Sequence, residues 1–131
     1  MLSSGRDRLV SKVIFDKPWV PDRRDIIWIN FNPQVGKEMR DVHPMVVLTT
    51  RAYNERTGLV IGLPMSTAAF NATNPFAVDN SGKSEVSYII CNQPKSMDWR
   101  LRGKPHVWGK VREAIFKQAC GELNDLVLLL A

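Results

Sequence analysis

The feature that most constrains the fold is a series of short apolar segments separated by gaps too short for a crossover helix. The segments are rich in β-branched and aromatic residues, which predicts strands at residues 26–31, 44–50, 59–64, 75–78, 86–91 and 107–111. Turn residues gather in the gaps at 54–58 and 79–83. Because parallel strands need a crossover of roughly a dozen residues, the spacing predicts a small antiparallel β-barrel rather than a parallel α/β sheet.

The two ends of the chain differ from this strand-rich middle. From Arg112 onward a helical period predicts a C-terminal amphipathic helix. Its apolar residues are Ile115, Phe116, Ala119, Cys120, Leu123, Leu126 and Leu130. Residues 1–23 carry an excess of basic side chains and two prolines, and we expect an irregular or partly helical extension there. Residues 24–131 are expected to form one domain with its own core.

Composition excludes several classes of protein. Cys91 and Cys120 lie in apolar surroundings without the spacing of a metal or redox motif, so we expect buried, reduced thiols. The longest apolar run, at 126–131, is too short to span a bilayer, and there is no signal-peptide core. Glycine-rich nucleotide loops and the common hydrolase and zinc motifs are missing from the sequence. We therefore expect a cytoplasmic protein with no metal, cofactor or membrane partner.

Positive charge is concentrated in one segment of a chain whose formal net charge is +5. Between residues 95 and 112 a single acid, Asp98, stands against the basic residues Lys95, Arg100, Arg102, Lys104, Lys110 and Arg112. Trp99, His106 and Trp108 are interleaved with them. Such a pattern suits single-stranded nucleic acid, because phosphates take the charge and bases stack on the rings. A solvated edge whose tryptophans point into the core is an equally good interpretation.

A charged loop between the first two predicted strands concentrates reactive groups. It offers an amine, a carboxylate, a guanidinium and an imidazole from Lys37, Glu38, Arg40 and His43. These groups suit RNA cleavage without a metal, which needs one group to deprotonate the 2′-hydroxyl, another to protonate the departing 5′-oxygen, and cations or hydroxyls to stabilise the phosphorane. Ser66 and Thr67, after the third predicted strand, are candidate hydroxyl donors. The alternative is a loop of solvated charges without a chemical role.

Short motifs then follow one another in a consistent order along the chain. They begin with Asp-Ile-Ile-Trp-Ile-Asn-Phe-Asn-Pro at 25–33, Gly-Lys-Glu at 36–38 and His-Pro-Met-Val-Val-Leu at 43–48. Further motifs lie at 52–54, 57–59, 64–67, 92–96 and 99–103. Each motif alone is weak. In order and spacing the whole set resembles the MazF/PemK family of toxin endoribonucleases over residues 24–130.

The resemblance implies a fold, an activity and partners. The implied fold is mainly β with helices: an SH3-like small antiparallel β-barrel of the CcdB/PemK plasmid-maintenance toxin type, with a C-terminal α-helix. The implied activity is that of a type II toxin, a sequence-specific, ribosome-independent endoribonuclease. Such an enzyme cleaves single-stranded mRNA without a metal and leaves a 2′,3′-cyclic phosphate and a 5′-hydroxyl. The implied partners are a second copy in a homodimer with an RNA groove, and a cognate acidic antitoxin.

The resemblance also assigns roles to individual residues. Glu38 matches the family glutamate and Ser66 the position of a catalytic Ser or Thr. Together with Arg40, His43 and Thr67 they form the expected catalytic set. The expected RNA-binding residues are Lys37, Asn92, Gln93, Lys95, Arg100 and Arg102.

Three positions depart from the family pattern. His43 stands where the family usually has arginine, Asn92 replaces a common aspartate, and Arg24 replaces a glycine. Histidine is the commonest general acid or base, whereas losing an always-charged phosphate donor would weaken the site. The alternative is therefore a catalytically impaired or non-enzymatic barrel that binds a protein such as DNA gyrase or an antitoxin.

Overall fold

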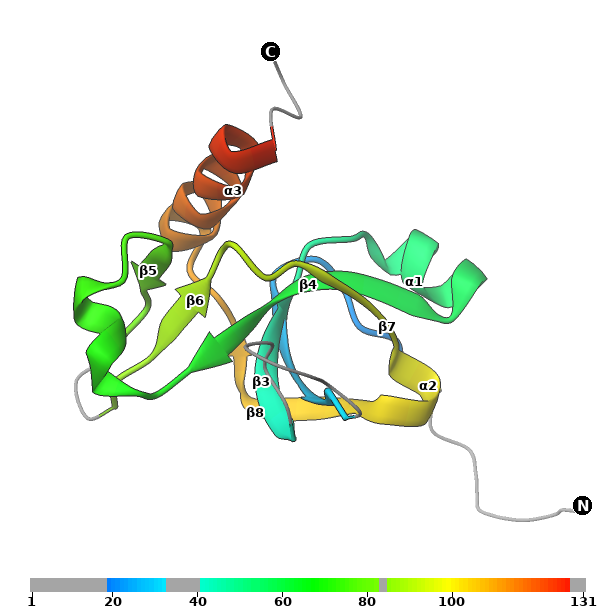
Figure 1. Cartoon of the computed structure of the whole chain (residues 1–131). Coiled ribbons are helices and arrows are strands. Elements are labelled where there is room, and N and C mark those ends of the chain that lie inside the picture. Colours follow the sequence, from blue (N-terminus) through cyan, green and yellow to red (C-terminus); the bar gives the residue numbers. More distant parts are fainter. Residues whose placement is uncertain (1–18, 33–40, 83–84, 128–131) are drawn as a thin grey trace, which may run out of the picture.

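An open antiparallel sheet forms the framework of the computed structural model, which describes residues 19–32, 41–82 and 85–127. Its strands are β2 (Asp25–Asn30), β3 (Val42–Val47), β4 (Leu59–Ser66), β5 (Ala77–Asp79), β6 (Tyr88–Ile90), β7 (Lys95–Asp98) and β8 (Gly103–Lys110). Its helices are α1 (Arg51–Thr57), the 3₁₀ helix η1 (Ala69–Thr73), α2 (Trp99–Arg102) and α3 (Glu113–Val127) (Figure 1). Each predicted strand overlaps an observed one, and the C-terminal helix is confirmed.

The sheet is organised around β4. The strand order is β5-β6-β4-β3-β2-β8, and β7 also pairs with β4. Met65 of β4 pairs with Ile89 of β6, whereas Gly62 pairs with Lys95 of β7, so β6 and β7 occupy successive parts of the same strand. The pairings between these strands are antiparallel, which confirms the predicted fold class. The barrel is not closed, because β5 and β8 are the two ends of the strand order.

Both faces of the central strands are buried. Met45, Val46 and Val47 of β3 have no exposed surface. The buried residues form two clusters. Val46 belongs to the cluster that contains Phe116 of α3, which we call the outer core. Met45 and Val47 belong to the cluster that contains Trp99 of α2, which we call the inner core. Because side chains alternate along a strand, a strand that is buried on both faces reads as a continuous apolar run. Of the two cysteines expected to be buried, Cys91 is buried, whereas Cys120 is only partly buried; both are free thiols.

Helix α1 corrects the turn predicted at residues 54–58. The hydroxyl of Thr50 accepts a hydrogen bond from the backbone N–H of Tyr53 at 3.3 Å and so caps the first turn. Gly58 ends the helix with a left-handed φ of +75°, which favours glycine. The residues that predicted a turn therefore include the C-cap of a short helix, which still joins two antiparallel strands, β3 and β4.

The pattern of the sequence does not predict β7 or α2. Strand β7 has the sequence Lys-Ser-Met-Asp, and Met97 is its one buried residue. No β-branched or aromatic residue marks this strand, so its pairing with β4 determines its conformation. Its last residue, Asp98, caps α2, because the Asp98 carboxylate accepts a hydrogen bond from the Leu101 N–H at 3.0 Å.

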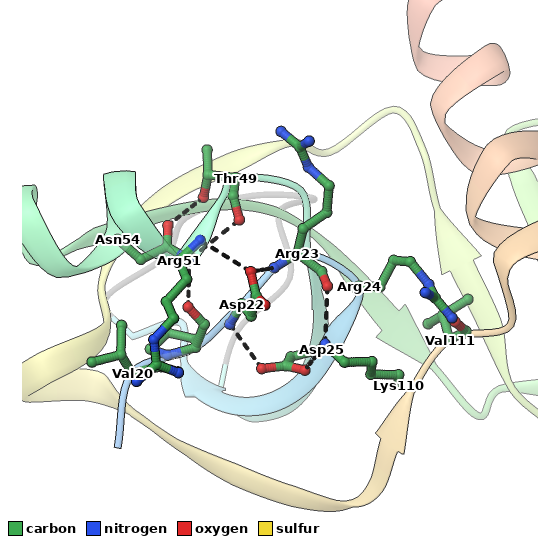
Figure 2. Close-up of polar contacts among 11 residues, drawn as sticks. Val20, Asp22, Arg23, Arg24, Asp25, Thr49, Arg51, Asn54, Lys110 and Val111 are labelled. Atoms are coloured by element: carbon green, nitrogen blue, oxygen red, sulfur yellow. Dashed lines mark hydrogen bonds and ion pairs between the residues drawn. The ribbon is translucent and has the colours of Figure 1, made fainter. Parts of the chain in front are cut away.

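The segment before β2 packs against the sheet. The rings of Trp19 and Trp99 meet edge to face with centroids 5.6 Å apart, and Val20 is buried in the inner core. The carboxylate of Asp22 accepts a hydrogen bond from the backbone N–H of Arg51 at 3.0 Å (Figure 2). Residues from 19 onward thus contribute to the core and to the start of α1.

Arg24, which replaces a glycine of the family that the sequence resembles, has a left-handed backbone conformation. Arg24 has a φ of +75°. Its backbone N–H donates to the Val47 carbonyl at 2.8 Å. Its Nε donates to the Val111 carbonyl at 3.0 Å (Figure 2). A left-handed conformation costs a residue with a side chain about 1 kcal/mol, and glycine adopts it freely. The side-chain hydrogen bond to Val111 offsets part of that cost.

The two substitutions Arg24→Gly and Arg24→Ala separate these effects. Both remove the Nε hydrogen bond, but only glycine relieves the backbone. We expect Arg24→Gly to have a free energy of unfolding about 1 kcal/mol higher than Arg24→Ala, measured by urea denaturation with matched slopes. An alanine variant as stable as the glycine variant would contradict a strained backbone at this position.

Candidate functional site

His43 and Ser66 lie at the same end of neighbouring strands. Met45 of β3 pairs with Pro64 of β4, and each of the two candidate residues lies two positions beyond this pair. By alternation, His43 shares the face of Met45, which belongs to the inner core. Ser66 follows Met65, a residue of the outer core, so Ser66 also points to the inner face. The structure therefore brings these two predicted catalytic residues to one end and one face of the sheet.

His43 is only partly buried, unlike the other histidine of the chain. The ring of His43 lies 6.5 Å from that of Phe31, centroid to centroid. His106 is instead enclosed by Trp28 and Trp108, whose centroids are each 4.3 Å from its own. Its Nδ1 accepts the Trp108 N–H at 3.0 Å, and burial lowers the pKa of His106. His43 is thus the more exposed of the two imidazoles.

The hydroxyl of Ser66 is held by groups that sequence reasoning missed. Its Oγ accepts hydrogen bonds from the Ala68 N–H at 3.1 Å and from Nδ2 of Asn71 at 3.2 Å. Asn71 is buried within η1. Thr67, the second predicted hydroxyl, is exposed in the turn between β4 and η1. The sequence signal for this contact is weak: Asn71 is a polar residue that lies shortly after Ser66.

The loop that carries Lys37, Glu38 and Arg40 lies outside the described residues, but its two ends are held together. The side-chain amide of Asn32 donates to the Asp41 carboxylate at 3.1 Å, and the Asp41 N–H donates back to Oδ1 of Asn32 at 3.0 Å. Asp41 has a left-handed φ of +66°. This reciprocal pair fixes where the chain leaves β2 and where it returns, two residues before His43.

Arg102 lies at the same end of the sheet as His43, on the other side of β2. Ile29 of β2 pairs with His43 on one side and with Gly103 on the other. The Arg102 guanidinium, just before Gly103, donates from Nη1 to the carbonyl of Asn30 at 3.2 Å and also to the carbonyl of Asn32. We call Asn32, Asp41 and Arg102 the loop-base clamp. Arg102, predicted to bind RNA, is exposed but bonds the backbone here.

Arg100 lies at the other end of β4. Its guanidinium donates to the Glu55 carbonyl of α1 and stands 5.0 Å from the centroid of the Trp99 ring. Trp99 itself is buried, and its Nε1 donates to the Asn54 carbonyl at 2.8 Å. The indole of Trp99 therefore belongs to the core and is not a stacking surface for bases. In the basic segment, the interpretation with an inward tryptophan is correct for Trp99.

Three further expected RNA-binding residues lie in the connection from β6 to β7 and at the start of β7. Asn92 is exposed and Gln93 partly buried in this connection, and Lys95 begins β7 opposite Gly62. Gly62 is separated from Ser66 by about 13 Å along an ideal strand. Lys95 therefore lies beside the middle of β4, apart from the His43–Ser66 end.

The fold and this arrangement of residues agree with one protein family. Residues 22–127 match the family described as PemK-like, MazF-like toxin of type II toxin-antitoxin system. The chain belongs to this toxin family. It is 38% identical over 85 residues to the endoribonuclease toxin MazF of Escherichia coli strain K12, a match that covers 65% of this chain and 75% of that protein.

Solved structures of toxins from the same family agree with the fold. The crystal structure of MazF from Deinococcus radiodurans superposes with a TM-score of 0.77 at 28% identity, covering 86% of this chain and all of that one (100%). MazF in a MazE–MazF complex from the same organism gives a TM-score of 0.69 at 25% identity, covering 84% of this chain and 97% of that one. The predicted family is therefore confirmed.

The described residues of the chain contain no metal-ligand cluster and no helix able to span a membrane. Across residues 19–32, 41–82 and 85–127, no three His, Cys, Asp or Glu side chains gather in a way that could hold a metal ion. Within the same ranges, no helix has the length and apolar character needed to cross a membrane.

Proposed function

We propose that this chain is the toxin of a type II toxin-antitoxin system and acts as a sequence-specific, ribosome-independent endoribonuclease on single-stranded mRNA. The observation that carries the proposal is the convergence of a partly exposed imidazole, His43, and a hydroxyl, Ser66, at one end of neighbouring strands. The 38% identity to an endoribonuclease toxin supports it.

The proposed reaction is an internal transfer that needs no metal. The 2′-oxygen attacks the neighbouring phosphorus, the bond from phosphorus to the 5′-oxygen breaks, and a 2′,3′-cyclic phosphate forms. One group accepts the 2′-hydroxyl proton and another delivers a proton to the 5′-oxygen, which leaves as a hydroxyl. Glu38 and His43 are the proposed proton carriers. Arg40, Ser66 and Thr67 are proposed to stabilise the negative charge of the phosphorane.

The proposed partners follow from the charge and from the relatives. A formal net charge of +5 suits both RNA and an acidic antitoxin. The MazE–MazF complex supports an antitoxin partner for a toxin of this family. We propose a homodimer in the cytoplasm. The expected domain at 24–131 is extended to include residues 19–23, because Trp19 and Val20 pack in its core. Within each chain, Lys37, Asn92, Gln93, Lys95 and Arg100 are the proposed RNA-binding residues. Arg102, also expected to bind RNA, donates to the carbonyls of Asn30 and Asn32 and is proposed to hold the base of the loop instead.

Incubation of the purified protein with a long RNA in EDTA tests the proposal. We expect cleavage at a short recurrent sequence, with cyclic phosphate and 5′-hydroxyl ends identified by sequencing of the fragments. Absence of cleavage, both in the natural protein and in His43→Arg, would contradict the endoribonuclease function. Inhibition of gyrase supercoiling without RNA cleavage would favour the non-enzymatic alternative, to which the departures at His43 and Asn92 point.

A further inference from the structure

The hydroxyl group of Ser66 is surrounded by hydrogen-bond donors. A serine hydroxyl has two acceptor lone pairs and one proton. Its Oγ accepts from the Ala68 N–H at 3.1 Å and from Nδ2 of Asn71 at 3.2 Å. With two donors directed at the oxygen, its own proton is left to donate elsewhere. Ser66 is partly exposed, so this proton can reach a bound group.

The orientation of the Asn71 amide is determined by its other partners. Its Nδ2 lies 3.1 Å from the Ala68 carbonyl oxygen, an atom that can only accept. Its Oδ1 accepts from Nδ2 of Asn74 at 3.0 Å. The Asn74 amide is fixed in turn, because its Oδ1 accepts the Phe76 N–H at 3.0 Å. Every donor in this row therefore points toward Ser66.

Burial holds the Asn71 end of the row in place. Asn71 is only 3% exposed, so water cannot readily replace its partners, whereas Asn74 is partly exposed and Phe76 exposed. Hydrogen bonds that run in one direction polarise one another, which strengthens the bond from Asn71 to Ser66. The row leads from the start of β5, through η1, to the end of β4 at which His43 also lies.

We propose that Asn71 is a positioning residue that keeps the Ser66 hydroxyl as a hydrogen-bond donor to a phosphate oxygen of the RNA. Ser66 then stabilises the charge that develops on the phosphorane and does not accept the 2′-hydroxyl proton, which leaves that task to another group. This inference rests on the proposed endoribonuclease function and assigns a direction to one of its hydrogen bonds.

The substitution Asn71→Asp reverses that direction while changing little of the shape. A carboxylate cannot donate, so it would accept the Ser66 proton and withdraw it from the phosphate. We expect kcat to fall by about 100-fold, as for loss of one donor to a developing oxyanion, with a much smaller change in KM. We also expect the deficit to shrink as the pH falls and the new carboxyl group is protonated, because a protonated carboxyl can donate again.

Matched variants separate position from charge. Ala72→Asp places the same charge on an exposed neighbour in η1 and is expected to keep kcat close to the natural value. Asn71→Ala introduces no charge and is expected to lower kcat by about 10-fold or less, because the freed hydroxyl can still donate in some orientations. Thermal melting of each variant checks that it is folded.

A double-mutant cycle that combines the Asn71 variants with Ser66→Ala decides whether Asn71 acts through Ser66. If it does, Asn71→Asp and Asn71→Ala cause no further loss in the Ser66→Ala background. Three results would overturn the inference. The first is that the losses of kcat multiply in the double variants. The second is a loss of kcat in Ala72→Asp equal to that in Asn71→Asp, and the third is an Asn71→Asp variant as active as the natural protein. Should the aspartate variant not fold, the alanine pair still decides. Failure of the proposed function is distinct, because the natural protein itself would not cleave RNA.

Discussion

Replacement of His43 by alanine is expected to lower kcat for RNA cleavage by about 100-fold or more, the usual contribution of a positioned acid or base. The free energy of unfolding should change by no more than about 1 kcal/mol, because the side chain is partly exposed at the end of β3. Single-turnover cleavage of a short RNA and urea denaturation measure the two quantities separately.

Two companion variants show which property of His43 matters. Val42→Ala, at the preceding exposed residue, is the control for a general disturbance of the strand end and should retain natural kcat. His43→Arg restores the family residue and supplies a fixed charge that does not titrate near neutrality. If proton transfer is the role of His43, this variant loses the pH dependence that His43 contributes. Natural kcat in His43→Ala would remove this residue from the reaction.

Replacement of Arg102 by alanine is the second change with a large expected effect. The loop-base clamp loses the hydrogen bonds from the guanidinium to the carbonyls of Asn30 and Asn32. We expect kcat to fall by about 10-fold or more, because small displacements of positioned groups are costly to catalysis. We expect the affinity for RNA and its salt dependence to change little, since this guanidinium bonds the backbone.

The salt dependence of RNA binding distinguishes this role from a phosphate contact. A lost contact with single-stranded RNA lowers the slope of log affinity against log salt by about 0.7 and weakens binding uniformly. Arg56→Ala removes the same charge from exposed α1 and is the matched control. Arg102→Lys keeps the charge but not the forked geometry. A lysine variant with natural kcat, or a reduced salt slope in Arg102→Ala, would contradict the clamp.

The sequence predicts the parts of the fold that local chemistry determines. The strand segments are recognisable because burial on both faces makes them continuously apolar, as at 45–47. Helix α1 is misread because its polar residues have long-range partners. Asn54, with no exposed surface, donates from Nδ2 to the Pro21 carbonyl at 2.8 Å, a contact across 33 positions. No local pattern contains that information.

The same limit applies to the site. The motifs locate His43 and Ser66, and the pairing of β3 with β4 brings them to one end. The contact of Arg102 with Asn32 joins residues 70 positions apart, so the basic segment predicts charge but not the partner of that charge. Asn71 is only five positions from Ser66, so their hydrogen bond is local and depends on the conformation of η1. The Arg102 contact, by contrast, follows from tertiary structure.

Burial of β3 on both faces has a consequence for the alignment of the strands. A slip of one residue normally exposes apolar side chains to water, which prevents it, but here it would exchange one buried apolar face for another. Gly62 restricts the register instead. A Cβ at this position would lie 2.5 Å from the carbonyl oxygen of Val46, so only glycine fits there. A slipped strand would also carry His43 to the opposite face from Ser66. A residue without a side chain therefore sets the alignment of the two candidate catalytic residues.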